Sequence, residues 1–281
     1  MPSAEVFTGM KTLKAVAFDL DDTLLRDDLS ISDYTVSVLR RLRDQGVRII
    51  PASGRSRPSM LPFVEQIGCA DLYIACNGAE IWNAKDHSLI RRETFPLETA
   101  RRIIAFGQEH GCYTQTYDDA RFYFNRHCHY ADAYAASSML KGEYVADLAA
   151  FVHDPSFKFL MMDDTEKIAA LLPVAQEAFA GEASVTCSKP WFLEFNPPRA
   201  TKGIALGDVL AGFGIPPSEA AAFGDSLNDW SMLSLCGLSV CVANARPELL
   251  SRCGAVCPSN QEDGVARYLE AHFAKAEEAK A

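Results

Sequence analysis

The sequence predicts an α/β fold, in which a doubly wound parallel sheet carries an inserted α+β domain. Two observations lead to this prediction. Short apolar runs alternate with helical patterns near both ends of the chain, whereas residues 86–194 combine strands and helices in a different order. A chain of 281 residues is also longer than the usual single domain, so one large α/β domain or two domains are expected.

The first strand-helix-strand unit starts close to the N-terminus. An apolar run at 15–18 predicts a buried strand, residues 33–45 carry apolar side chains with helical spacing, and residues 47–50 predict a second strand. Ser32 is a suitable N-cap, and Gly46 stands just past the end of the helix. This order of elements is typical of a parallel βαβ unit.

The same alternation returns near the C-terminus. Residues 220–223 and 238–242 predict two buried strands with a helix around 229–235 between them. The helix before these strands has an apolar face, which consists of Leu206, Val209, Leu210 and Phe213. The alanine-rich C-terminal end is expected to fray.

Residues 86–194 are predicted to form the inserted α+β domain, and residues 1–85 and 195–281 the α/β core. Helices are expected near 97–110 and 166–180, and strands at 112–116, 121–124, 157–162 and 191–195. Pro197 and Pro198 would make a stiff return from the inserted domain to the core.

Composition excludes several classes of function. A net charge of −10 and an isoelectric point near 5.1 argue against nucleic acid or an anionic membrane as the main partner, since both need basic surface. No stretch approaches 18 uncharged apolar residues, and no leader-like segment is visible at the N-terminus, so the cytoplasm is the expected location. A small anionic substrate stays possible, because it needs only local positive charge.

Nine cysteines are scattered along the chain without a repeated paired spacing. Their odd number and irregular spacing are typical of reduced, buried thiols and not of a disulfide framework. A structural zinc site is not expected, because Cys253 and Cys257 lack a second pair.

Carboxylates follow the first predicted strand directly, at Asp19, Asp21 and Asp22. Residues two apart in an extended segment point the same way, so Asp19 and Asp21 can face one site. Two such charges about 4 Å apart repel by roughly 4 kcal/mol at an effective dielectric near 20. A cation or a retained proton would relieve this repulsion. The alternative interpretation of the segment is a solvated turn.

Two further segments could bind an anion. Ser53 and Gly54 follow the second strand, where a hydroxyl and backbone N–H groups could hold a phosphate oxygen. Lys202 stands at the start of a predicted helix, where the helix dipole disfavours a cation unless an anion lies nearby. An ordinary turn and an exposed lysine are the alternatives.

The fourth informative segment follows the strand at 220–223. Asp225 could complete an all-oxygen magnesium site, and Asn228 and Asp229 could orient ligands and waters there. Because ligands bind at the carboxyl ends of parallel strands, all four segments are expected to meet at one edge of the sheet.

Taken in order, an aspartate pair, a Ser-Gly turn, a lysine and a Gly-Asp-x-x-Asn-Asp segment resemble the haloacid dehalogenase-like phosphatases. The segments 73–79, 242–245 and 259–265 further resemble the Cof-type branch, which carries a large inserted cap of the C2 type. The resemblance covers nearly the whole core and only loosely the cap. It implies a Rossmann-like core, with Asp22 at a position where many relatives have glycine.

The resemblance also implies roles for individual residues. Asp19 would be the nucleophile, and Asp21 the general acid and base. Mg²⁺ would be the cofactor. The implied substrate-binding residues are Leu20, Ser53, Gly54, Lys202 and Asn228, and the implied metal ligands are Asp19, Asp21 through its backbone carbonyl, Asp225 and Asp229.

The expected function is Mg²⁺-dependent hydrolysis of small phosphorylated metabolites, sugar phosphates or similar phosphomonoesters, through an aspartyl-phosphate intermediate. A phosphosugar mutase of the same superfamily and a catalytically idle phosphometabolite-binding protein are the alternatives. The polar and aromatic residues of the cap segment are candidates for substrate contact: Tyr117, Tyr123, Asn125, His127 and Tyr130. Both a monomer and a homodimer are compatible with the sequence.

Overall fold

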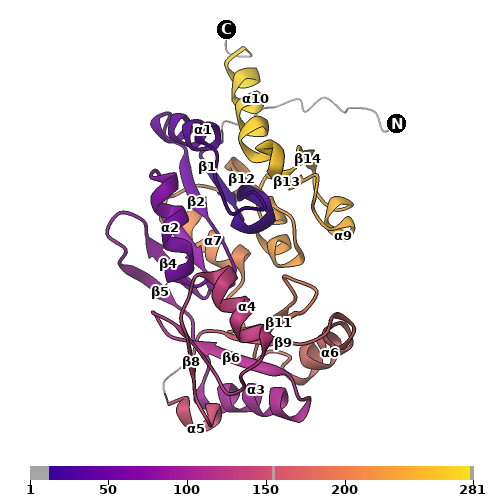
Figure 1. Ribbon diagram of the computed structural model, residues 1–281. Helices are drawn as coiled ribbons and strands as arrows, with labels where there is room; N and C mark the ends of the chain where they lie inside the picture. Colours follow the sequence, from indigo (N-terminus) through magenta and orange to yellow (C-terminus); the bar gives the residue numbers. More distant parts are fainter. Residues whose placement is uncertain (1–12, 154–155, 279–281) are drawn as a thin grey trace.

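The computed structural model describes residues 13–153 and 156–278. A five-stranded parallel sheet of order β14-β13-β12-β1-β2 forms its α/β core (Figure 1). These strands span Ala15–Phe18 (β1), Arg48–Pro51 (β2), Ala220–Gly224 (β12), Leu238–Val242 (β13) and Ala255–Cys257 (β14). Every side chain along β1 and β12 is buried, so both faces of the sheet are covered, as a doubly wound fold requires.

Helices and a small antiparallel sheet complete the α/β core. Helix α1 packs against α10 and α7 packs against α8. The helices span Asp33–Asp44 (α1), Arg57–Ile67 (α2), Lys202–Gly212 (α7), Trp230–Leu233 (α8), Pro247–Leu250 (α9) and Gly264–Glu278 (α10). The small sheet has the order β3-β4-β5, with strands at Leu72–Ala75, Glu80–Asn83 and Leu89–Arg92. A parallel bridge between Ala52 and Ile74 joins it to the end of β2.

The segment from 97 to 196, which we call the cap, contains a six-stranded sheet of order β10-β11-β9-β6-β7-β8. Its strands span Tyr113–Tyr117 (β6), Phe122–Phe124 (β7), Gly142–Tyr144 (β8), Phe159–Met162 (β9), Ser184–Thr186 (β10) and Phe192–Asn196 (β11). Its helices span Leu97–Glu109 (α3), His129–Ser138 (α4), Leu148–Phe151 (α5) and Thr165–Ala178 (α6). A parallel core with an inserted α+β cap confirms the predicted fold class.

The two faces of the cap sheet have different neighbours. One face forms a separate hydrophobic cluster with α3 and α6, in which Phe159, Leu193 and Phe195 are fully buried. Helix α4 lies on the other face, between the cap sheet and the α/β core, as Figure 1 shows. Tyr134 of α4 packs edge-on against Phe122 of the sheet. This second face therefore borders the region where the cap meets the core.

The predicted helix at 33–45 is confirmed, and Ser32 caps it by accepting the backbone N–H of Thr35. At the C-terminal end α10 continues as a helix to Glu278, and the expected fraying stays a prediction, part of which concerns residues 279–281 outside the described range. Alanine and glutamate have high helix propensity, which favours this continuation. Among the described residues, no helix combines the length and the apolar character needed to span a membrane.

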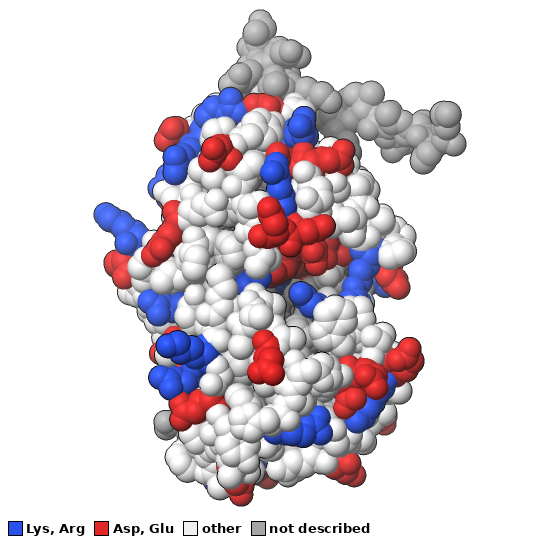
Figure 2. All heavy atoms as spheres, in the orientation of Figure 1, with Lys and Arg blue, Asp and Glu red and all other residues white. Residues whose placement is uncertain are grey.

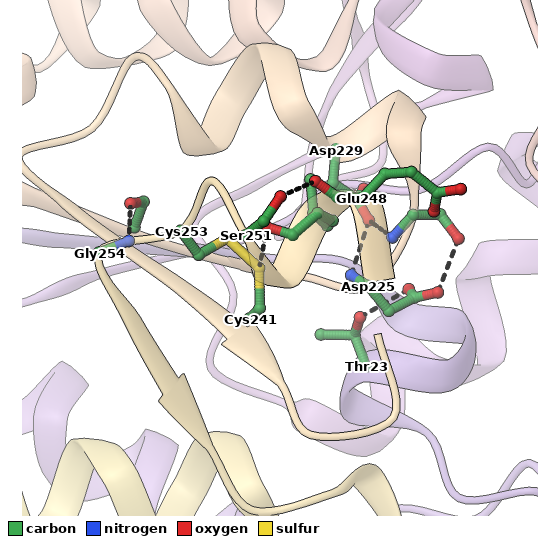
Figure 3. The surroundings of a disulfide bond; sticks show 11 residues. Thr23, Asp225, Asp229, Cys241, Glu248, Ser251, Cys253 and Gly254 are labelled. Atoms are coloured by element: carbon green, nitrogen blue, oxygen red, sulfur yellow. Dashed lines mark hydrogen bonds between the residues drawn. A yellow bond between two sulfur atoms is a disulfide. The ribbon is translucent and has the colours of Figure 1, made fainter. Parts of the chain in front are cut away.

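The structure also corrects the expectation that all cysteines are reduced. Cys241 of β13 and Cys253, which follows α9, form a disulfide with a Cα–Cα distance of 6.0 Å (Figure 3). The other seven cysteines are free. The bond closes the loop that leaves β13, whose Asn244 side chain donates to the Asp22 carbonyl oxygen. Strand β13 and the end of α9 determine this pairing, and the spacing of the cysteines in the sequence does not reveal it.

We expect the disulfide to stabilise the protein by about 3 kcal/mol, because it closes a loop of 12 residues and so restricts the unfolded chain. Urea unfolding of the wild type with and without reductant measures this contribution. The Cys253→Ser variant should be less stable by a similar amount and insensitive to reductant, whereas Cys128→Ser should keep the reductant response. Titration of nine free thiols in the denatured, unreduced protein would contradict the bond.

Candidate active site

A pocket lies between the α/β core and the cap, at the carboxyl ends of three parallel strands. Acidic side chains gather beside a hollow in the middle of the face shown in Figure 2. The core contributes Asp19, Asp21 and Asp22 after β1, Ser53, Gly54 and Arg55 after β2, and Asp225, Ser226 and Asn228 after β12. The structure thus brings together segments that lie about 200 residues apart in the sequence.

Asp19 is fixed by the sheet and by a buried lysine. Its backbone N–H donates to the Phe223 carbonyl oxygen of β12 at 3.1 Å. The ammonium of Lys202, in the first turn of α7, is fully buried and donates to Asp19 Oδ1 and to Asp229 Oδ1, each at 2.6 Å. Burial raises the pKa of Asp19 well above its usual range, although Lys202 opposes this shift.

The pKa of Lys202 is raised. Burial alone would lower it, but the two carboxylates outweigh burial. Lys202 is therefore a charged ammonium and is not the exposed lysine of the alternative interpretation. Lys202 is positioned by a close approach between the backbone at Gly78 and the backbone at Thr201. Gly78 has a φ of +102°, and a Cβ there would lie 2.3 Å from the carbonyl oxygen of Thr201. Glycine at 78 lets the loop after β3 pack against the start of α7.

Asp225 is held by two hydroxyl groups, which Figure 3 shows in part. Its Oδ1 accepts from Thr23 at 2.9 Å and its Oδ2 from Ser226 at 2.7 Å. Burial, followed by the charge of Asp229, raises the pKa of Asp225 to about 7. Asp229 is fully buried, and its Oδ2 accepts the backbone N–H groups of Asp225 and Ser226, both at 3.0 Å. Asp229 thereby fixes the loop that carries Asp225.

The carboxylates of Asp19, Asp225 and Asp229 fit a divalent cation. One oxygen from each lies within 4.8 Å of the others. Three buried carboxylates repel one another, and a single ammonium offsets only part of that charge. An all-oxygen donor set matches Mg²⁺ better than zinc, which favours nitrogen and sulfur ligands. Asp229 accepts from the Lys202 ammonium and from two backbone N–H groups and does not line the pocket. Asp19 and Asp225 do line it, and Asp225 accepts only from hydroxyl groups, so these two are better placed to bind a cation directly.

Asp21 has a partner that the sequence did not predict. Arg55 binds it with two hydrogen bonds, Nε to Oδ2 at 2.8 Å and Nη2 to Oδ1 at 2.7 Å. Burial alone would raise the pKa of Asp21, but Arg55 outweighs burial and the pKa is lowered. Arg55 also donates to the Ser137 carbonyl oxygen of the cap at 3.3 Å. Arg55 comes directly after Ser53-Gly54, at the same sheet edge as Asp21, and this position in the sequence could have identified it as a partner of Asp21.

The remaining predicted substrate-binding residues surround the same carboxylates. Ser53 is buried, and its hydroxyl accepts the backbone N–H of Arg55 at 3.1 Å. Asn228 lines the pocket and donates to Asn77 Oδ1 at 3.0 Å. Leu20 is buried directly after Asp19, so only its backbone can contribute to the site.

Asp22 adopts a left-handed conformation with a φ of 57°. Glycine is favoured at such a position, but aspartate is among the residues that tolerate it best. The backbone at 22 therefore follows the path that a glycine would take, and its carbonyl oxygen accepts the Asn244 side chain at 2.7 Å.

The structure corrects the expected cap contacts. None of Tyr117, Tyr123, Asn125, His127 and Tyr130 lines the pocket. Tyr123 donates to Asp118 on the far side of the sheet, and His127 stacks on Tyr144. The cap residues that do line the pocket are Tyr134, Ser137, Ser138, Lys158, Ser188, Lys189, Phe192 and Glu194. Two of them, Lys158 and Glu194, are single charges within otherwise apolar strand segments, a pattern that could have identified them.

A capped α/β core that gathers buried carboxylates and a lysine at the carboxyl edge of its sheet is the architecture of a hydrolase class. The model of the haloacid dehalogenase-like hydrolase family matches residues 16–269. The chain therefore belongs to this family.

Its relatives include named phosphatases. A protein of Haemophilus influenzae with the name "Putative phosphatase" is 31% identical over 265 residues, covering 92% of this chain and 98% of the relative. The 5-amino-6-(5-phospho-D-ribitylamino)uracil phosphatase YitU of Bacillus subtilis is 26% identical over 264 residues, covering 92% and 97%. A haloacid dehalogenase-like hydrolase structure from Bacteroides thetaiotaomicron matches with a TM-score of 0.82 and 25% identity, covering 92% and 99%. The protein is a phosphatase, a phosphoric monoester hydrolase.

Proposed function

We propose that the protein hydrolyses phosphomonoesters of small metabolites in a Mg²⁺-dependent reaction that passes through an aspartyl phosphate on Asp19. The observation that carries this proposal is the buried carboxylate of Asp19, held 2.6 Å from the Lys202 ammonium at the floor of a capped pocket. A carboxylate in this setting can attack phosphorus, and a cationic neighbour can bind the phosphoryl oxygens.

The proposed reaction has two steps. An Asp19 oxygen attacks phosphorus while Asp21 gives a proton to the departing ester oxygen, which releases the alcohol. Asp21 then takes a proton from a water that attacks the phosphorus of the aspartyl phosphate, which releases phosphate and restores Asp19. Asp21 must leave Arg55 to accept the first proton, since the guanidinium lowers its pKa. Substrate entry between the two side chains would allow this.

Positioning and electrostatics supply most of the rate acceleration in this scheme. Asp19, Asp225 and the backbone carbonyl of Asp21 would hold Mg²⁺, and Asp229 would contribute by fixing the loop that carries Asp225. The bound ion would neutralise charge on the phosphoryl oxygens. The Lys202 ammonium, the Ser53 hydroxyl and the backbone N–H groups of Leu20 and Gly54 would bind the remaining oxygens. Asn228 would orient the loop that carries Asp225.

We further propose that the α/β core is catalytic and that the inserted segment, predicted at 86–194, selects the substrate through the cap. Within that segment β5 pairs with β4 of the core, so the cap begins at 97 and ends with β11 at Asn196. Support comes from the pocket, in which the two carboxylates that accept from Lys202 belong to the core and the opposite wall belongs to the cap. The cytoplasm is the proposed location, because seven of the nine cysteines are free thiols; the Cys241–Cys253 disulfide is an exception to that pattern. The Bacillus subtilis relative acts on a phosphorylated ribityl compound, which makes polyol phosphates a reasonable first class of substrate.

A phosphate-release screen tests the proposed function. Phosphosugars, polyol phosphates, nucleotides and pyridoxal phosphate should be offered with and without Mg²⁺, and product sugars should be analysed for isomerisation. We expect free phosphate from at least one small ester, only with the metal. Isomerised phosphosugar without free phosphate would instead identify a mutase. Binding of an ester without any turnover would identify the binding protein.

A further inference from the structure

Two charged side chains are buried in the cap sheet where it faces the pocket. Lys158 precedes β9 and Glu194 lies in the neighbouring strand β11, and each is about 2% exposed. Lys158 Nζ donates to Glu194 Oε1 at 2.8 Å. A buried ion pair loses so much hydration that apolar residues of similar volume are often equally stable. Stability alone therefore gives little reason for charges at these positions.

The oxygens of Glu194 are unequally used. Oε1 accepts from Lys158, whereas buried Oε2 accepts no hydrogen bond from any residue in the described part of the chain. The nearby Ser188 hydroxyl helps to lower the pKa of Glu194 without a bond of normal geometry to Oε2. Burial would raise this pKa, but Lys158 outweighs burial. Glu194 is thus an ionised carboxylate with one available oxygen.

In a second buried carboxylate, Glu80 of β4, both oxygens accept hydrogen bonds. Its Oε1 accepts from Arg92 at 2.7 Å and its Oε2 from the Trp82 indole at 3.1 Å. Glu80 does not line the pocket, whereas Glu194 does. Buried acceptors are nearly always paired, so an oxygen left over at a pocket wall points to a partner that enters the pocket.

Lys158 also fixes the position of Glu194 relative to the phosphate end of the pocket. Its ammonium donates to the Gly54 carbonyl oxygen of the core at 2.6 Å, next to Ser53. The same side chain therefore holds the carboxylate of Glu194 and the loop proposed to bind phosphate. The aromatic rings of Tyr134 and Phe192, 6.2 Å apart, line the wall beside them.

We propose that Glu194 Oε2 accepts a hydrogen bond from a hydroxyl or amino group of the leaving alcohol. Glu194 is then a specificity-determining residue, and the preferred substrates are phosphate esters of polyols, sugars or amino alcohols. Esters of purely apolar alcohols leave a buried carboxylate oxygen unpaired and are selected against. This inference rests on the proposed phosphatase function and assigns the substrate class of the same pocket.

Matched pairs of esters test the inference. Ribitol 5-phosphate is compared with pentyl phosphate, and glycerol 3-phosphate with propyl phosphate, by the ratio of kcat/KM within each pair. This ratio does not depend on the fraction of active enzyme, so partial misfolding of a variant does not change it. We expect the wild type to favour the hydroxylated ester of at least one pair by tenfold or more.

The Glu194→Gln variant should reduce that preference roughly 10-fold or more, since a hydrogen bond to a charged acceptor is stronger than one to a neutral amide oxygen. Because this change leaves the Lys158 charge without its partner, a second variant, Lys158→Met combined with Glu194→Met, removes both charges together. It should show the same loss of preference. The control is Glu80→Gln, which disturbs a buried carboxylate outside the pocket and should leave the ratio unchanged.

The outcomes separate the inference from the function on which it rests. Wild-type activity with a ratio that stays within about twofold in both Glu194 variants overturns the inference and leaves the phosphatase function standing. The inference is also overturned if the wild-type enzyme prefers neither hydroxylated ester over its apolar counterpart. If the wild type hydrolyses no ester at all in this set or in the phosphate-release screen, the proposed function itself fails.

Discussion

Replacing Asp19 with asparagine should abolish phosphate release while the protein stays folded. An amide of nearly the same shape keeps the oxygen that accepts from Lys202, but it cannot attack phosphorus. We expect kcat/KM to fall more than 100-fold, which corresponds to about 2.7 kcal/mol of lost transition-state stabilisation. Steady-state phosphate release on the best ester of the screen provides the measurement.

The stability of the same variant distinguishes loss of chemistry from loss of fold. Burial raises the pKa of Asp19 against the opposing charge of Lys202, and the charges of Asp229, Asp225 and Asp21 raise it further. A neutral asparagine removes part of this repulsion, so thermal unfolding should occur at the wild-type temperature or above. Residual activity greater than about one hundredth of the wild type, in a folded variant, would exclude Asp19 as the nucleophile.

Removal of divalent metal should have an effect of similar size. The carboxylates of Asp19 and Asp225 lie within reach of one cation, and without it they repel both each other and a phosphate dianion. After exhaustive chelation we expect at least a 100-fold loss of activity, restored by Mg²⁺ or Mn²⁺. Excess Ca²⁺ should inhibit, because its longer bonds and higher coordination number disturb in-line geometry.

Two variants make the metal experiment specific. Asp225→Asn should raise the Mg²⁺ concentration needed for half-maximal activity at least tenfold, since one charged ligand is lost. Asp28→Asn changes an exposed carboxylate outside the pocket and should leave the requirement unchanged. Full activity after chelation would show that the acidic cluster has no metal-dependent role in turnover.

The core side of the pocket could be predicted because it depends on short-range patterns. An apolar strand followed at once by Asp19 or Asp225 identifies a strand end, and parallel strands align their carboxyl ends at one edge. The carboxyl ends of β1, β2 and β12 therefore lie close together, and this does not depend on how individual side chains pack. The predicted strands at 15–18 and 238–242 have the bounds that the structure shows.

The cap side could not be predicted in the same way, because it depends on register and packing between distant segments. Tyr117 and Tyr123 belong to one hairpin but lie on opposite faces of the cap sheet. Tyr117 accepts from Gln115 on the buried face, whereas Tyr123 donates to Asp118 on the far side. Lys158 and Glu194 become partners only because β9 and β11 pair antiparallel. Helix α4 was not predicted, because its small and polar residues show little apolar periodicity.

The two hydrogen bonds that join Lys158 to Gly54 and Arg55 to Ser137 have a consequence for how such a protein diverges in evolution. Both acceptors are peptide carbonyl oxygens, which every residue type supplies. Replacing Ser137 changes a side chain at the pocket wall but leaves its carbonyl in place. During evolution, the cap residues that contact the leaving group can therefore be replaced one at a time, while the cap keeps its hydrogen bonds to the loop at Gly54 and Arg55.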